Sequence, residues 1–168
     1  MVLAATTIET PSYESWSGSV TEFAGSADQG SVFHQPVLLS ETLERLLVHP
    51  GGVYLDATAG EGGHTSALLQ ASTPGGRVLG IDRDPRSLAR AAVRLERFGE
   101  SFIPLQGNYS QMVAMANDQG IDRVDGILMD LGLSSRQLDT PGYGFSFRTD
   151  EPLDMRYDPK GPLSADDI

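Results

Sequence analysis

Three acidic side chains stand at the ends of short apolar segments and could bind a hydroxylated or cationic ligand. Asp56, Asp82 and Asp130 follow apolar runs that begin near residues 53, 77 and 124. Glycines at positions 60, 62 and 63 lie after the first run, so the backbone there could approach a ligand and offer amide groups at a helix N-terminus. The glycines alone are a weak signal, because a tight turn without any ligand would need them too.

The spacing of Asp82 favours a nucleoside ligand. Asp82 lies 22 residues after Gly60, where nucleotide-binding folds place an acid that accepts hydrogen bonds from ribose hydroxyls. Such bonds contribute ~1.5–3 kcal/mol each and favour a ribose without a 2′-phosphate. Tyr109 could stack on an adenine ring, which is worth ~1–3 kcal/mol in base–aromatic systems. A solvated strand-end acid and a core tyrosine remain the alternatives.

The ligand chemistry fits S-adenosylmethionine better than a dinucleotide. The glycine turn has no Arg or Lys for a pyrophosphate, and the acids Asp56, Asp82 and Asp130 would favour a cationic sulfonium. A NAD-binding oxidoreductase is less favoured because Thr65 stands where its fingerprint needs glycine. Ser134 and Ser135 lack the nucleophile-elbow pattern of hydrolases. No metal site is expected, since the three histidines lack ligand spacing.

The elements that would position these residues alternate between helical and strand patterns, which predicts an α/β fold with a parallel sheet. Strands are expected at 53–57, 77–82, 102–105 and 124–130, and the third should be an edge strand because it contains Pro104. No strand is expected after Pro152. In such a sheet ligands bind at the carboxyl ends of the strands. Helices are expected at about 39–47, 64–71, 84–98 and 110–119.

The third of these helices has the clearest boundaries. Asp84 can cap it, Pro85 suits its first position, and Gly99 fits just past its end. Its sequence predicts two faces, one apolar and one basic. The apolar face comprises Leu88, Ala91, Ala92 and Leu95, and the basic face comprises Arg86, Arg90, Arg94 and Arg97.

Composition restricts the class of protein. The chain has 168 residues, 23 acids, 12 bases, a net charge of −11 and no cysteine, which excludes disulfides, cysteine zinc sites and thiol catalysis. It lacks the ~18 consecutive apolar residues of a membrane span and the pattern of a secretory signal, so a cytoplasmic location is expected. Residues 1–33 hold four acids, no Lys or Arg and ten Ser or Thr, which predicts a disordered leader before a domain at 34–168.

Six blocks of sequence closely resemble the bacterial ribosomal RNA small subunit methyltransferase H family. They are residues 34–39, 56–65, 80–85, 130–139, 142–148 and 152–156, so the resemblance covers the chain from His34 onward. It implies a Rossmann-like class I methyltransferase fold. It also implies transfer of a methyl group from S-adenosyl-L-methionine to the N4 amino group of a cytidine, in the decoding region of 16S rRNA within the small ribosomal subunit.

The family's functional positions can be carried over onto this chain. Cofactor contacts then fall on Gly62, Gly63, His64, Asp82, Tyr109, Asp130 and Gln137, with Tyr109 replacing a phenylalanine and keeping a stacking ring. We hypothesise that Asp130, Ser134 and Ser135 accept hydrogen bonds from the target amino group, or that Asp130 contacts only the cofactor. The loop residues Tyr143, Phe145, Phe147 and Arg148 are expected to bind the target base, with packing inside the loop as the alternative for the three rings.

The chain departs from the family in length. Family members continue past this point with a helical insertion and further strands, so we expect a truncated product or a fragment, with an exposed edge at the 124–130 strand that favours aggregation. A non-catalytic module that binds cofactor or ribosome is therefore an alternative to an enzyme. The acidity predicts weak RNA binding by this chain alone. RNA affinity would then come from the four-arginine face, an absent C-terminal half or the assembled ribosomal particle.

Overall fold

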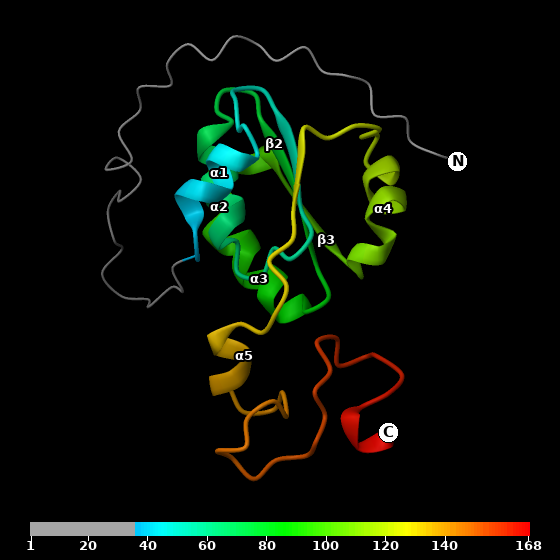
Figure 1. Cartoon of the computed structure of the whole chain (residues 1–168). Helices are drawn as coiled ribbons and strands as arrows, with labels where there is room; N and C mark the ends of the chain where they lie inside the picture. The colour runs from blue at the N-terminus through cyan, green and yellow to red at the C-terminus, as the bar shows by residue number, and fades with distance from the viewer. Residues whose placement is uncertain (1–35) are drawn as a thin grey trace. The chain divides into compact units, whose positions relative to one another are not determined.

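A computed structural model describes residues 36–168, which lie in one compact unit, and the predicted leader at 1–33 falls outside this range. Four parallel strands form one sheet in the order β3-β2-β1-β4 (Figure 1). The strands are β1 (Val53–Asp56), β2 (Arg77–Asp82), β3 (Phe102–Gln106) and β4 (Gly126–Leu128). The α-helices are α1 (Leu39–Arg45), α2 (Gly63–Ala71), α3 (Pro85–Arg94), α4 (Met112–Asp118) and α5 (Ser135–Asp139), with 3-10 helices η2 (Glu96–Ser101), η3 (Tyr109–Gln111) and η4 (Ala165–Asp167).

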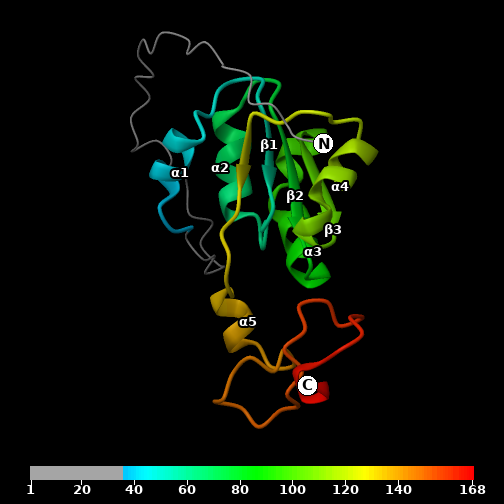
Figure 2. The same cartoon turned by 45° about the vertical axis from the view of Figure 1, so that its right-hand side comes forward.

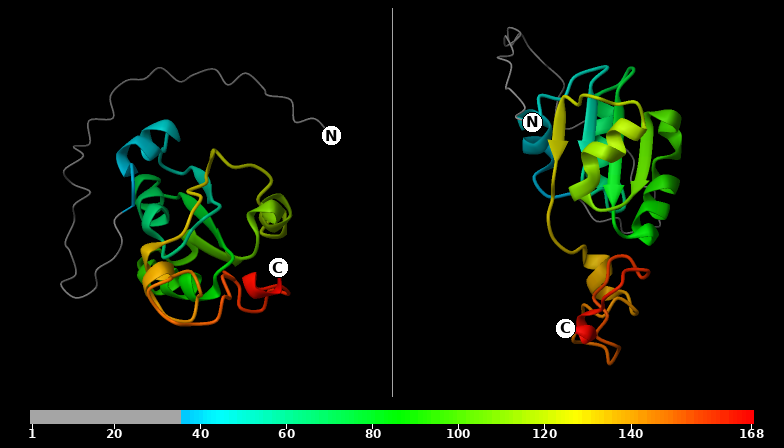
Figure 3. Two further views of the ribbon diagram at one scale, coloured as in Figure 1. Left: turned by 60° about the horizontal axis from the view of Figure 1, so that its bottom comes forward. Right: turned by 90° about the vertical axis from the view of Figure 1, so that its right-hand side faces the viewer.

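Helices cover both faces of the sheet, as the alternating pattern predicts. Tyr54, Val78 and Phe102 are in register on adjacent strands and pack with α2 and α3. The next residues along the strands, Leu55 and Leu79, belong to a second core that includes Ala116 of α4. Figure 2 shows α2 and α4 on opposite sides of the sheet, and Figure 3 shows the strands running side by side in the same direction. The predicted Rossmann-like α/β fold is confirmed.

The edge position of β3 is confirmed, whereas β4 is shorter than predicted. Pro104 pairs with Gly80 on one side of β3, which is the last strand of the sheet. The strand expected at 124–130 is reduced to Gly126–Leu128. Side chains end its pairing with β1, because Val53 N donates to Asp125 Oδ2 and Asp130 N donates to Thr58 Oγ1.

The start of α3 matches the prediction and its end does not. Asp84 caps the helix and Pro85 begins it, but the helix ends at Arg94 and Gly99 lies inside η2. A 3-10 helix repeats every three residues. Leu95, at the start of η2, and Phe98, three residues later, therefore pack against the same core. Ala92 is exposed, so assigning it to the buried face was wrong.

The other helices also differ from their predicted limits. The first ends at Arg45 and not near Leu47, which adopts a left-handed φ of 50°. The helix expected at 110–119 begins as a 3-10 turn at Tyr109 and continues as α4. Residues 152–168 contain η4 and no strand, as expected. Within residues 36–168, no helix is long and apolar enough to cross a membrane.

Candidate functional site

A pocket of about 820 Å³ opens at the carboxyl ends of the strands. The strands after β1 are added first on one side of it, as β2 and β3, and then on the other side, as β4, and ligands of doubly wound sheets bind where the strand order switches in this way. The volume falls within the ~300–1,000 Å³ typical of small-molecule sites. The pocket is lined by parts of the glycine turn, by the ends of β2 and β4, and by the residues that lead into and form α5.

The glycine turn is built around positive φ angles and one carboxylate. Gly60 and Gly62 have φ of 52° and 78°. The amide of Gly60 donates to Asp82 Oδ2 at 2.7 Å, while Gly60 and Gly63 both line the pocket. Gly62 is not a lining residue, because it faces the core and a Cβ there would lie 2.8 Å from Leu95 Cδ1. Gly62 therefore has a packing role, and the cofactor contact carried over to it stays a prediction.

Asp82 is in the predicted place. It ends β2, lines the pocket and accepts hydrogen bonds from Gly60 N on one oxygen and from Asp84 N, at 2.9 Å, on the other. Burial raises its pKa. An ionised carboxylate offers about four acceptor positions, so acceptor capacity remains for donors in the pocket beyond the backbone amides that already contact Asp82. Hydroxyl groups of a ribose are donors of that kind.

Asp56 does not line the pocket, and the interpretation that it contributes to a cationic ligand site is wrong. Its side chain is enclosed by the core, with 1% exposure. Thr65 Oγ1 donates to Oδ2 at 2.7 Å and Thr58 N donates to Oδ1 at 3.2 Å. Burial raises the pKa of Asp56. The Asp56–Thr65 bond instead ties β1 to α2 beneath the glycine turn.

Asp130 and His64 lie together in the pocket wall. The Asp130 carboxylate is 54% exposed and stands 3.8 Å from Nδ1 of His64. The other ring nitrogen of His64 is within 3.0 Å of the carbonyl oxygen of Val37. Because Thr58 Oγ1 accepts from the backbone of Asp130, the carboxylate is held beside the end of β1 while remaining accessible. The Asp130 carboxylate is thus available to a ligand, whereas His64, whose side chain is 10% exposed, lines the pocket with both ring nitrogens near a partner.

Two tyrosines line the pocket, and only one was predicted. Tyr109 is 38% exposed, so its ring is open to stacking. Tyr157 comes from the far C-terminal segment, and its hydroxyl donates to the carbonyl of Gly132 at 3.3 Å. Burial and then the nearby charge of Asp82 raise the pKa of Tyr157. No sequence signal connects Tyr157 to the pocket, since it lies in an irregular segment 75 residues beyond Asp82.

The predicted polar residues of α5 are partly occupied by their own helix. Ser134 and Gln137 form a capping box, in which Ser134 Oγ accepts from Gln137 N and Gln137 Oε1 accepts from Ser134 N. Gln137 is 6% exposed, and its Nε2 donates to Asp84 Oδ2 at 3.4 Å. All three α5 candidates line the pocket. Only Ser135 is exposed there, so its hydroxyl is more accessible than that of Ser134.

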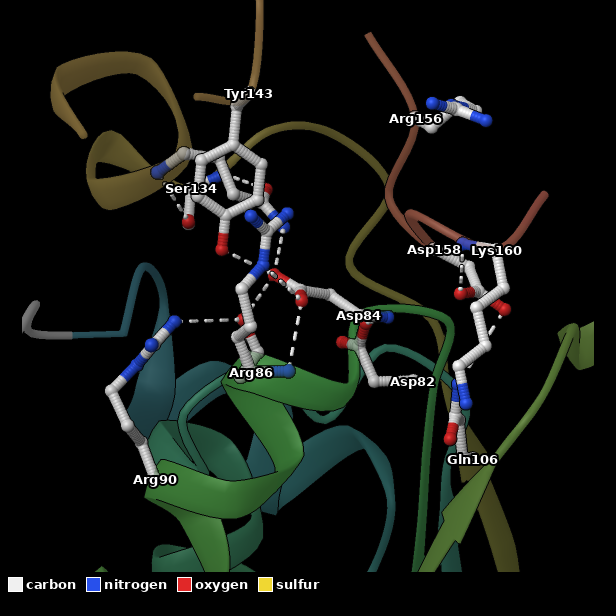
Figure 4. Close-up of polar contacts among 12 residues, drawn as sticks. Asp82, Asp84, Arg86, Arg90, Gln106, Ser134, Tyr143, Arg156, Asp158 and Lys160 are labelled. Atoms are coloured by element: carbon white, nitrogen blue, oxygen red, sulfur yellow. Dashed lines mark hydrogen bonds and ion pairs between the residues drawn. The ribbon is translucent and has the colours of Figure 1, made fainter. Parts of the chain in front are cut away.

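The aromatic loop divides into a buried and an exposed part. Tyr143 is 2% exposed, donates to Asp84 Oδ2 at 2.7 Å, and is covered by the Arg86 guanidinium 3.4 Å from its ring centre (Figure 4). Phe145 is half-buried between Tyr143 and Tyr157. Because the ring of Tyr143 is buried beneath Arg86, the structure favours the alternative of packing inside the loop over base recognition for this residue. Phe147 and Arg148 are exposed.

The arginine face of α3 is largely neutralised. Arg86 pairs with Asp84, and Arg90 pairs with Glu61 at 2.7 Å. Glu61 also forms an ion pair with Arg136 of α5. The sequence pattern predicts no role for Glu61, which lies between two glycines of the turn. Of the three possible sources of RNA affinity, the four-arginine face is weakened by the pairing of Arg86 and Arg90 with acids of this chain. Over the described part of the chain, no group of three His, Asp or Glu residues is placed to hold a metal.

Comparisons with known proteins agree with the sequence blocks. Residues 31–168 match the MraW methylase family. The ribosomal RNA small subunit methyltransferases H of Trichlorobacter lovleyi and Geobacter sulfurreducens are each 50% identical to this chain over 135 residues, which is 80% of the chain and 43% of each of those proteins. The chain therefore spans less than half the length of these curated relatives.

Solved structures with partial similarity include two methyltransferase-type proteins. Aeropyrum pernix fibrillarin with natively bound S-adenosyl-L-methionine is 21% identical with a TM-score of 0.44, covering 51% of this chain and 36% of that one. An RNA methyltransferase of Salinibacter ruber with S-adenosyl-L-homocysteine is 24% identical with a TM-score of 0.39, covering 47% and 52%. The match over residues 31–168 decides the identity, and the chain belongs to the MraW methylase family.

Proposed function

We propose that this chain carries the cofactor-binding part of an S-adenosyl-L-methionine-dependent methyltransferase that acts on the N4 amino group of a cytidine in the decoding region of 16S rRNA. The observation that carries the proposal is the pocket in which Asp82 retains free acceptor positions beside the Gly60 amide. Relatives named ribosomal RNA small subunit methyltransferase H support the substrate class.

The pocket residues fit the parts of this cofactor. Asp82 would accept hydrogen bonds from the ribose hydroxyls, and the Tyr109 ring would stack on adenine. The exposed carboxylate of Asp130 would lie in the field of the sulfonium. When bound, S-adenosyl-L-methionine supplies an electrophilic methyl group. No basic side chain lies in the glycine turn, which suits a ligand without a pyrophosphate.

The chain's own contribution to the reaction would be positioning and hydrogen-bond acceptance. The amino nitrogen of cytosine is a poor nucleophile because its lone pair is delocalised into the ring. Its N–H groups must be held by acceptors while the nitrogen becomes tetrahedral, so preorganised oxygens lower the barrier. We assign this role to the Asp130 carboxylate and the Ser135 hydroxyl, which are exposed in the pocket wall. Ser134 would act by capping α5.

The target base and its RNA would be contacted by the exposed end of the aromatic loop. Phe147 is 99% exposed, and the side chain of Arg148, which follows it, is 80% exposed and lies 4.0 Å from Asp139. A ring and a guanidinium next to each other suit stacking and phosphate binding. Phe147→Ala should therefore reduce RNA methylation and leave the melting temperature unchanged.

Calorimetric titration with S-adenosyl-L-methionine, S-adenosyl-L-homocysteine and NAD tests the cofactor assignment. Binding of the first two and not of NAD is expected, whereas selective NAD binding would establish the oxidoreductase alternative.

Transfer of a labelled methyl group to small ribosomal subunits then separates an enzyme from a binding module. Asp130→Asn should abolish transfer, with Asp118→Asn, an exposed acid that does not line the pocket, as the matched control. A variant that loses only cofactor affinity would limit Asp130 to cofactor contact.

A further inference from the structure

The buried carboxylate of Asp84 joins the start of α3 to a distant part of the chain. Its side chain has no exposed surface and accepts five hydrogen bonds. Three come from the first turn of α3, namely Arg86 N at 2.9 Å, Arg86 Nε at 3.1 Å and Ser87 Oγ at 3.0 Å. The other two come from Tyr143 OH at 2.7 Å and Gln137 Nε2 at 3.4 Å (Figure 4).

Helix capping alone does not account for this arrangement. A capping acid needs one or two backbone donors and can keep the rest of its carboxylate in water. Asp84 is removed from water instead, which is unfavourable for an ion unless its acceptor positions are filled. A carboxylate has about four such positions, and α3 supplies three donors. Tyr143 OH, at 2.7 Å, fills the remaining position and the longer bond from Gln137, at 3.4 Å, shares the same oxygen, so the burial of Asp84 and the attachment of residues 134–143 depend on each other.

The attached segment is a wall of the pocket. Residues 131–137 together with Asp139 and Thr140 line it, and they connect directly to Tyr143. A second anchor joins the same wall to the glycine turn, where Arg136 binds Glu61. Beyond Tyr143, the ring of Phe145 packs on Tyr157, which also lines the pocket. The contacts of Asp84 therefore hold the helical part of the wall in place. They also hold Tyr143, whose ring contacts Phe145, which in turn contacts Tyr157.

We propose that Asp84 is a positioning residue for the cofactor pocket, acting through its hydrogen bonds with Tyr143 and Gln137 to hold the 131–143 wall against α3. Asp84 is not a lining residue, so it acts without touching the ligand. The identity of that ligand rests on the function proposed above, but the attachment of the wall does not.

A pair of matched variants tests the proposal in the whole chain. Tyr143→Phe and Ser87→Ala each remove one hydroxyl that donates to the same oxygen of Asp84. Tyr143 belongs to the 131–143 wall, whereas Ser87 lies within α3 and itself lines the pocket, so Ser87→Ala is the control for exchange in the wall and not for cofactor affinity. Hydrogen exchange at the amides of residues 134–140 should become about tenfold faster in Tyr143→Phe and remain unchanged in Ser87→Ala. The dissociation constant for S-adenosyl-L-methionine should rise about tenfold in Tyr143→Phe, equivalent to ~1.4 kcal/mol, mainly through faster release.

The outcomes separate this proposal from the proposed function. Equal exchange rates in the wall of both variants would make Asp84 an ordinary helix cap and overturn the inference. Faster exchange with unchanged cofactor affinity would likewise overturn the positioning role. If the unaltered chain binds no S-adenosyl-L-methionine, the proposed function fails, while the exchange comparison still decides whether Asp84 holds the wall.

Discussion

The bond between Thr65 and Asp56 should account for a measurable share of the stability of this chain. Thr65→Val keeps the shape of the side chain and removes the hydroxyl that donates to Asp56 Oδ2 at 2.7 Å. Both residues are buried, at 0% and 1% exposure, so water cannot replace the lost donor. A hydrogen bond to a charged group contributes ~1.5–3 kcal/mol. For a domain of this size, that predicts a fall in melting temperature of about 5–15 °C.

The loss of stability caused by Thr65→Val should depend on pH in a defined direction. Burial raises the pKa of folded Asp56 above its unfolded value, while Thr65 opposes that shift by bonding the charged form. The stability contribution of such a group is fully present below the unfolded pKa, and it is lost as pH rises through the folded pKa. Thr65→Val removes a bond that lowers the pKa of Asp56, so it raises the folded pKa further. More stability is then lost as pH rises. The difference from the unaltered chain should therefore be largest at neutral pH and shrink in acid.

Urea denaturation followed by circular dichroism at pH 7 and pH 4 measures both effects. Thr65→Ser is the control, because it keeps the hydroxyl and loses only a methyl group, whose cost should not vary with pH. A Thr65→Val loss below ~0.5 kcal/mol, which is the scale of a neutral surface change, would refute the reasoning. So would a loss of equal size at both pH values. Cofactor affinity should stay unchanged, since neither residue lines the pocket.

Three further changes test other parts of the structure. Tyr109→Ala should weaken S-adenosyl-L-methionine binding about 5- to 150-fold by calorimetry, from a stacking contribution of ~1–3 kcal/mol, whereas Tyr109→Phe should retain it. Gly80→Ala should lower the free energy of unfolding in urea by ~1–3 kcal/mol, because its Cβ would lie 2.7 Å from Phe102 Cε2 and 3.1 Å from Ala59 Cβ; an unchanged midpoint would contradict that packing. Arg156 holds the pKa of Asp154 at about 2, so the pair should stabilise its segment above about pH 4 and lose this effect as pH falls toward 2. Arg156→Gln should return that pKa toward 3.8 in a carboxyl NMR titration.

Local chemistry in the sequence determined much of the fold. Pro104 has no backbone N–H to donate to a neighbouring strand, which favours an edge position, and β3 is indeed at the edge of the sheet. Asp84 and Pro85 specify a helix start that the structure reproduces. Limits that depend on tertiary packing were less predictable. The end of α3 was placed near Gly99, whereas burial of Leu95 and Phe98 converts its last turns to a 3-10 helix.

The sequence by itself determined the α/β alternation, the strand-end acids, the glycine turn and the family blocks, because these are properties of neighbouring residues. Only the tertiary structure decided which of those residues face the pocket. Asp56 and Asp82 both end strands, yet Thr65 covers the first while the second lines the pocket. Tyr143 and Phe147 lie four residues apart, yet one is buried against Asp84 and the other is exposed. The partners responsible lie up to 59 residues away, and neither periodicity nor spacing encodes contacts over such separations.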